Sequence, residues 1–110
     1  MIHKTPIAVL ISGRGSNMRA LIEACARPDY PARIVLVLSN RPDAGGLEVA
    51  REAGLPTIAI DHKAFGKDRA AHEIKVDEAI KASGAEIVCL AGYMRVLTPY
   101  LVDAWHGKML

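Results

Sequence analysis

The 110-residue sequence has little net charge, no long apolar run and only two cysteines. Its 14 Lys and Arg nearly balance its 12 Asp and Glu, whereas a nucleic-acid surface needs a clustered basic excess. No apolar stretch approaches the ~18–20 residues of a membrane helix, and the N-terminus lacks the apolar core and cleavage site of a signal peptide. These absences predict a cytoplasmic protein that binds neither nucleic acid nor a membrane.

The cysteines and histidines are not placed to form a disulfide framework or a metal site. Cys25 and Cys89 lie far apart in apolar segments, which is typical of reduced core residues. None of the four histidines has metal-ligand spacing to a cysteine or a carboxylate. We therefore expect no metal, and we interpret Asp61 and His62 as a turn rather than a catalytic pair.

Apolar runs alternate with amphipathic segments along the whole chain. Four runs rich in β-branched and aliphatic residues predict strands that are buried on both faces, at residues 6–12, 33–39, 56–60 and 86–91. Helices are expected in the segments after these strands, at residues 18–25, 47–53, 67–83 and 99–105. This alternation predicts a single α/β domain with a doubly wound, mostly parallel sheet and helices on both faces.

The third expected helix is rich in charge, and the chain stops soon after the fourth. We assign an inward face to the small and aliphatic residues of the third helix, Ala70, Ile74, Ala79 and Ile80. A solvated face is assigned to its charged residues, Lys67, Asp68, Arg69, Glu73, Lys75, Asp77, Glu78 and Lys81. Thr98 and Pro99 predict the cap and the first residue of the last helix. Residues 108–110 look like the opening of a fifth strand, so we expect a truncated domain whose exposed sheet edge favours self-association.

A glycine-rich turn, GRGSN at residues 13–17, follows the first strand. Ligands of doubly wound sheets bind beyond the carboxyl ends of the strands, and here the amides of Gly15, Ser16 and Asn17 face the start of a helix, where the dipole favours an anion. A dinucleotide fingerprint would need a third glycine at Met18, and a P-loop would need Gly-Lys-Ser/Thr. Both patterns fail, so the turn suits a single phosphate group. A plain turn without a ligand is the alternative.

The segment LAGYMRVL, residues 90–97, follows the fourth strand and should lie on the same rim as the glycine turn. Tyr93 and Met94 offer apolar area, and Arg95 supplies a cation. Apolar walls with one or two fixed polar groups are typical of a site for a flat heterocycle. A loop packed into the core, with a solvated arginine, is the alternative.

Two long motifs resemble those of the phosphoribosylglycinamide formyltransferases. They are VLISGRGSN at residues 9–17 and CLAGYMRVLTP at residues 89–99; VLSNRPDAGGLEVAREAGLPT at 37–57 and the closing GKML also match. The resemblance implies a formyltransferase-like, Rossmann-related fold. It implies transfer of a formyl group from 10-formyltetrahydrofolate to the amine of glycinamide ribonucleotide in purine biosynthesis. Residues 1–110 would then be the N-terminal part of that domain, which binds ribonucleotide and folate.

The resemblance assigns ligand-binding residues but no catalytic ones. It implies that Gly15, Ser16 and Asn17 bind the phosphate of glycinamide ribonucleotide. It implies that a later set binds the folate cosubstrate, Arg69, Met94, Arg95, Val96 and Leu97, with Lys67 as the alternative to Arg69. The family's catalytic Asn and His lie in an Asn-x-His-Pro-Ser motif after GKML, and its catalytic Asp lies further on. We therefore expect the 110 residues alone to bind weakly and not to catalyse.

Three other functions fit parts of the same pattern. A formyltetrahydrofolate deformylase uses water in place of the amine, and a hydrolase needs no phosphate site of the kind that GRGSN offers. A methionyl-tRNA formyltransferase would need a basic surface, which the slight net charge does not supply. A non-catalytic phosphate- or nucleotide-binding module would bind the ribonucleotide but not a folate analogue.

Overall fold

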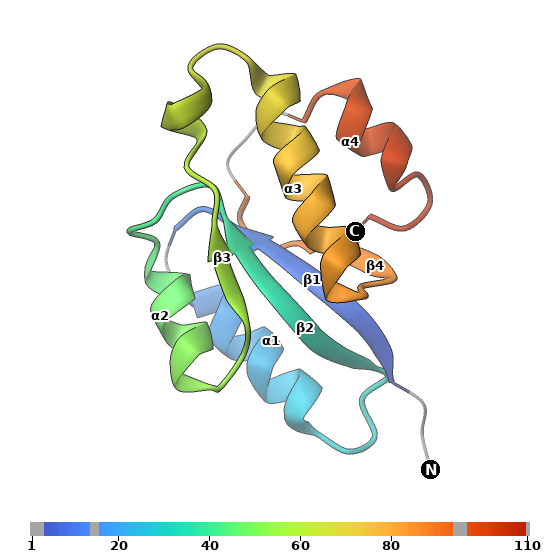
Figure 1. Cartoon of the computed structure of the whole chain (residues 1–110). Coiled ribbons are helices and arrows are strands. Elements are labelled where there is room, and N and C mark those ends of the chain that lie inside the picture. The colour runs from blue at the N-terminus through green and yellow to red at the C-terminus, as the bar shows by residue number, and fades with distance from the viewer. Residues whose placement is uncertain (1–3, 14–15, 94–96, 110) are drawn as a thin grey trace.

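The computed structural model describes residues 4–13, 16–93 and 97–109 (Figure 1). Its elements are β1 (Thr5–Ile11), α1 (Ser16–Ala26), β2 (Ala32–Ser39), α2 (Gly45–Glu52), β3 (Thr57–Ala59), the 3-10 helix η1 (His62–Phe65), α3 (Arg69–Ser83), β4 (Ile87–Leu90) and α4 (Pro99–Ala104). Every strand and α-helix predicted from the sequence pattern is present, with ends shifted by a few residues. The 3-10 helix is an addition. Within the described ranges, no helix has the length and apolar character needed to cross a membrane.

The four strands form one parallel sheet in the order β3-β2-β1-β4. The chain winds outward from β1 through β2 to β3, with α1 and α2 as the connections on one face of the sheet. It then returns through α3 on the opposite face and places β4 on the other side of β1 (Figure 1). The predicted doubly wound α/β fold is confirmed, and its winding direction reverses between β1 and β4.

Alternating residues of the central strands build one apolar core on each face of the sheet. The first core lies under α1 and α2 and contains Ile7, Val9, Ile11, Met18, Val37, Ala44, Leu47 and Ala50. The second core lies under α3 and α4 and contains Ala8, Leu10, Leu36, Leu38, Val76, Ile80, Val88, Leu101 and Trp105. Because both sides of β1 are buried, its sequence is apolar without alternation, as a covered parallel strand requires.

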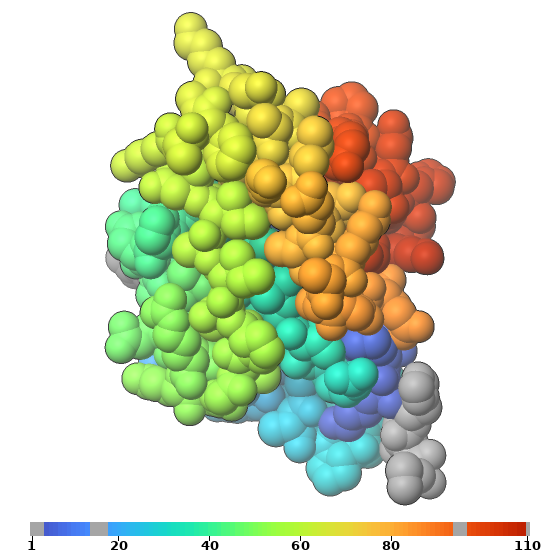
Figure 2. Space-filling model, viewed as in Figure 1, coloured from blue at the N-terminus to red at the C-terminus, as the bar shows by residue number. Residues whose placement is uncertain are grey.

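The buried face of α3 differs from the predicted one. Its buried residues are His72, Glu73, Val76, Asp77 and Ile80. Ala70 and Ile74, which we predicted to face inward, are exposed. Glu73 and Asp77, which we predicted to be solvated, are only 4% and 2% exposed. The reason is that α4 packs beside α3 on this face (Figure 2) and supplies hydrogen-bond donors that compensate for burial of the two carboxylates.

Residues 108 and 109 lie beside β4. Met109 forms a parallel bridge with Val88, and the Val88 amide donates to the Lys108 carbonyl over 2.8 Å. This pairing confirms that the segment opens a further strand position on the outer side of β4. Self-association through a sheet edge stays a prediction.

Candidate functional site

The candidate site lies at the carboxyl ends of β1 and β4, where the winding direction of the sheet reverses. Leu10 of β1 is paired with Leu90 of β4, and the Ala91 amide donates to the Leu10 carbonyl over 2.9 Å. The glycine-rich turn after β1 and the segment after β4 therefore leave the sheet from neighbouring strands. This pairing confirms the prediction that the two segments start from the same edge of the sheet.

The structure describes some of the predicted site residues. Four of them, Gly15, Met94, Arg95 and Val96, lie outside the described residues. Ser16 and Asn17 are the first two residues of α1, so their amides belong to the first turn, whose N–H groups have no partner within the helix. Leu97 is half-buried, packs against the second core and lies two residues before α4.

Arg69 and Lys67 lie at the start of α3. Arg69 is the first residue of the helix, and both side chains belong to exposed residues. Asp68 caps the helix, because its Oδ1 accepts a hydrogen bond from the Ala71 amide over 3.0 Å. The start of α3 lies at the side of the sheet where the strands end (Figure 1).

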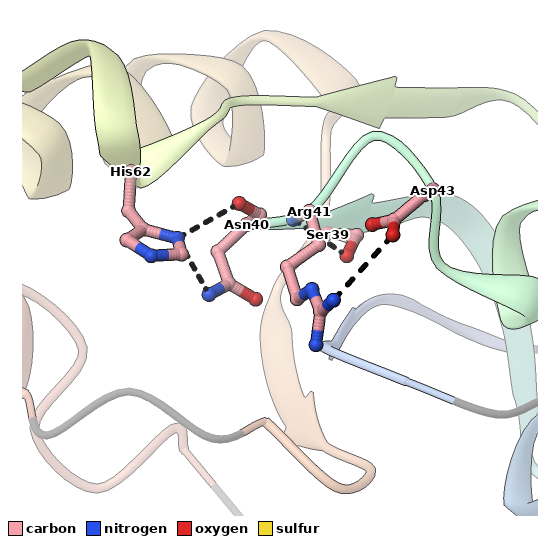
Figure 3. Close-up of polar contacts among 5 residues, drawn as sticks. All are labelled: Ser39, Asn40, Arg41, Asp43 and His62. Carbon is pink, nitrogen blue, oxygen red and sulfur yellow. Dashed lines mark hydrogen bonds and ion pairs between the residues drawn. The ribbon is translucent and has the colours of Figure 1, made fainter.

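A buried polar network supports the rim. Asn40, which directly follows β2, is 2% exposed, and its Oδ1 accepts a hydrogen bond from Ser12 Oγ over 2.5 Å. Both Nδ2 and the carbonyl oxygen of Asn40 lie 3.1 Å from Nδ1 of His62 (Figure 3). Asp61 accepts the Lys63 amide over 2.9 Å, as the predicted turn requires. The network joins residues that follow three neighbouring strands. We did not predict it from the sequence, where the available signal is the pair Ser39-Asn40 at the end of an apolar run.

A pocket of about 180 Å³ opens beside this network, lined by Ser12, Gly13, Arg41, Asp43, Ala44 and Gly45. The Gly46 amide donates to the Gly13 carbonyl over 3.1 Å, so the glycine turn is bonded to the start of α2. Nη2 of Arg41 lies 3.4 Å from Oδ2 of Asp43, while the Arg41 amide donates to Ser39 Oγ over 3.0 Å (Figure 3). The rim therefore presents a polar hollow next to the turn.

Glu73 of α3 holds the first turn of α4. Its carboxylate accepts hydrogen bonds from the Thr98 amide over 2.6 Å, from the Leu101 amide over 3.2 Å and from the Thr98 hydroxyl. Thr98 occupies the N-cap position and Pro99 the first helical position, as predicted, but the Thr98 side chain does not cap the helix. Glu73 performs that function from a neighbouring helix.

Asp77, one turn further along α3, holds the other end of α4. Its Oδ1 accepts the indole N–H of Trp105 over 2.7 Å, and Oδ2 lies 3.4 Å from the Tyr100 hydroxyl. Oδ2 also pairs with Nζ of Lys81 over 2.9 Å. This carboxylate raises the pKa of the Lys81 ammonium above its ordinary value.

The two cysteines are free thiols that pack against the first core. Both are half-buried, and burial raises the pKa of the Cys25 thiol and of the Cys89 thiol. A thiol with a raised pKa is a poor nucleophile at neutral pH. Among the residues that the structure describes, no three His, Cys, Asp or Glu side chains are grouped so that they could hold a metal ion.

Comparisons with known proteins agree with this architecture. The formyl transferase family model matches residues 5–110. The trifunctional purine biosynthetic protein adenosine-3 of Bos taurus is 48% identical over 107 residues, which are 97% of this chain and 10% of that protein. The phosphoribosylglycinamide formyltransferase of Escherichia coli is 40% identical over 104 residues, which are 94% of this chain and 49% of that enzyme.

Solved structures show the same similarity. The phosphoribosylglycinamide formyltransferase of Brucella melitensis has a TM-score of 0.91 at 40% identity, covering 96% of this chain and 55% of that one. The Coxiella burnetii enzyme has a TM-score of 0.89 at 36% identity, covering 97% of this chain and 50% of that one. This chain thus spans about a tenth of the trifunctional relatives and about half of the bacterial ones. The chain belongs to the formyl transferase family, and within it resembles the phosphoribosylglycinamide formyltransferases.

Proposed function

We propose that this chain is the ribonucleotide- and folate-binding part of a cytoplasmic phosphoribosylglycinamide formyltransferase. The reaction transfers the formyl group of 10-formyltetrahydrofolate to the amine of glycinamide ribonucleotide in de novo purine biosynthesis, without a metal. One observation carries the proposal: β1 pairs directly with β4, so the glycine turn and residues 92–97 start from neighbouring strands. Two substrates that must react with one another need adjacent sites of this kind.

The ribonucleotide phosphate binds at the start of α1. The amides of Gly15, Ser16 and Asn17 supply donors there, and the positive end of the helix dipole favours a doubly charged group. A glycine in the turn leaves the main chain open to the phosphate oxygens, because it has no Cβ. The remainder of the ribonucleotide then extends toward the segment after β4.

The folate cosubstrate binds between that segment and the start of α3. Met94, Val96 and Leu97 supply apolar contacts for the pterin ring, and Arg95 supplies a cation at the rim. Arg69, or Lys67 in its place, meets an anionic part of the folate from the start of α3. The two ligands thus use different elements, so a change in one site need not disturb the other.

The chemistry follows from holding the two ligands together. The amine attacks the formyl carbon, a C–N bond forms, and the carbonyl electron pair moves to oxygen. The carbonyl then re-forms as the bond from that carbon to the folate nitrogen breaks; the attacking nitrogen loses one proton and the folate nitrogen takes one up, so the formyl group ends as an amide of the ribonucleotide. The chain contributes orientation and proximity to this step, and we assign no catalytic residue within residues 1–110.

Titration with glycinamide ribonucleotide and with a folate analogue tests the proposal, and both ligands should bind. Gly15→Val should weaken ribonucleotide binding ~10-fold or more by blocking charge-assisted hydrogen bonds, and leave folate binding within about twofold. Ala20→Val, at an exposed position of α1, is the matched control and should change neither affinity. Binding of the ribonucleotide alone would indicate a phosphate-binding module, binding of folate alone a deformylase, and equal loss of both ligands in Gly15→Val would count against the phosphate site.

A further inference from the structure

The short helix α4 depends on contacts from outside itself. It spans six residues, Pro99–Ala104, which is too short for a helix to be stable alone. Tyr100 and Val102 are 42% and 43% exposed, whereas Leu101 is fully buried. Among the residues that the structure describes, α4 is oriented by packing of Leu101 and Trp105 in the second core and by hydrogen bonds to two carboxylates of α3.

Glu73 accepts more hydrogen bonds from α4 and its N-cap than Asp77 accepts from α4 and its C-cap. Three donors converge on Glu73, from the amide and hydroxyl of Thr98 and from the amide of Leu101. Both carboxylate oxygens are used, and the side chain is 4% exposed, so the geometry at Thr98 is fixed in direction as well as in distance. A buried negative charge at the first turn of a helix is also favoured by the helix dipole.

The contact between Glu73 and Thr98 lies next to the residues that we propose bind the folate. Thr98 directly follows Leu97, the last of the residues proposed to contact the folate. At the other end, the Ala91 amide is bonded to the Leu10 carbonyl of β1. Residues 92 and 93 therefore follow a residue that is bonded to β1, and Leu97 directly precedes a residue that Glu73 holds.

We propose that Glu73 is a positioning residue for the folate site: its carboxylate fixes Thr98 and thereby the place of the neighbouring Leu97, without touching a ligand. This inference rests on the proposed function, because it assumes that Leu97 binds folate. It predicts that loss of the carboxylate weakens folate binding selectively, while ribonucleotide binding at the start of α1 is unaffected.

Asp77 provides a matched control for the test. It lies on the same helix as Glu73, is equally buried and also holds α4, through Trp105 and Tyr100. Its shorter contact, of 2.7 Å, is to Trp105 at the far end of α4, and among the described residues its hydrogen bonds do not reach Thr98, the residue next to Leu97. A merely structural role for Glu73 would make the two carboxylates equivalent, whereas a positioning role makes them different.

The experiment compares Glu73→Gln with Asp77→Asn in the full chain. The glutamine amide has an oxygen that accepts hydrogen bonds and an NH2 group that donates them. Whichever way this amide is turned, its NH2 group meets at least one donor that the carboxylate had accepted from. Glu73→Gln should weaken binding of a folate analogue by at least ~10-fold, the size expected for charge-assisted hydrogen bonds, and change ribonucleotide affinity by less than about twofold. Asp77→Asn should lower the melting temperature comparably and leave both affinities within about twofold.

Hydrogen exchange supplies a readout that needs no ligand. The amides of Leu97 and Thr98 should exchange faster in Glu73→Gln than in Asp77→Asn. Should Glu73→Gln fail to fold, Glu73→Asp retains the charge but loses the reach, and the same comparison applies to it. Unchanged folate binding, equal folate loss in Asp77→Asn, or unchanged exchange of these two amides would overturn the proposal. Failure of the unmodified chain to bind folate would instead refute the proposed function, while the exchange comparison would still decide whether Glu73 holds Thr98.

Discussion

The two faces of the sheet are covered by helix pairs that are held in different ways. Every buried residue that the structure describes in α1 and α2 is apolar or a glycine: Met18, Gly46, Leu47 and Ala50. On the opposite face, α3 buries His72, Glu73 and Asp77 as well as aliphatic residues. The His72 ring is held in place, because its Nε2 donates a hydrogen bond to the Ile60 carbonyl over 2.8 Å.

The difference reflects what each face has to hold. Apolar packing is strong but has no preferred direction, whereas hydrogen bonds to a buried carboxylate fix an orientation. On the first face, the proposed phosphate site uses the backbone of α1, whose amides are oriented by the helix itself. On the second face, the proposed folate residue Leu97 lies directly before Thr98, which Glu73 holds by hydrogen bonds from a neighbouring helix.

The apolar face should show the largest loss of stability on substitution. Leu47→Ala removes a fully buried side chain of α2 from the first core, and we expect about 2–5 kcal/mol lower free energy of unfolding. Urea unfolding measures this change. Ile58→Ala, at a side chain that is 39% exposed, is the control and should cost less than about 1 kcal/mol. Equal losses in the two variants would mean that the first core is not packed as described.

The polar face should show a smaller loss with a local signature. Asp77→Ala leaves the buried indole N–H of Trp105 without its acceptor, and we expect a loss of about 1–3 kcal/mol. Because Trp105 is the single tryptophan of the chain, its fluorescence reports this site alone. The emission of the folded variant should shift relative to the unmodified protein, and Glu78→Ala, on the exposed side of α3, should leave it unchanged. An unshifted spectrum with full stability would show that the Asp77 contact contributes nothing.

The same contrast explains what the sequence could and could not predict. The first face follows rules that depend on local pattern, since β1 and β2 are continuous apolar runs and Met18 starts an apolar stripe at helical spacing. That the loops after β1 and β4 start from the same edge of the sheet was expected from the switch point of a doubly wound fold. For these elements, burial and hydrophobicity coincide, and the predictions were confirmed.

On the second face, burial and hydrophobicity do not coincide. Ala70 and Ile74 look like core residues and are exposed, while Glu73 and Asp77 look solvated and are buried. A buried carboxylate depends on donors from α4, which lies more than 20 residues away in the sequence, so no pattern within α3 reveals it. The available signal is indirect: acidic residues four apart on α3 would have to be matched with a Thr-Pro helix start elsewhere.

The smallest expected effect is the pH dependence that the two thiols on the first face give to the free energy of unfolding. Burial raises the pKa of the Cys25 and Cys89 thiols above the ordinary value of 9.0, so the folded protein keeps these protons longer than the unfolded chain does. The unfolded state therefore loses protons first as the pH rises, and linkage makes the folded state less stable above pH 9.0. Below that pH the thiols contribute no slope, because both states are protonated.

Cysteine-to-alanine variants isolate this contribution. Replacing Cys25 and Cys89 by alanine changes the overall stability through packing, so the quantity to compare is the slope of unfolding free energy against pH. That slope should be less negative in the double variant near pH 9.0, where the Lys81 ammonium, whose pKa is raised above its ordinary value of 10.5, contributes little slope of its own. Lys81→Met should leave the slope in this window unchanged, because the polar face begins to lose its ion pair only at higher pH. An identical slope with and without the thiols would mean that burial against the first core does not favour their protonated form.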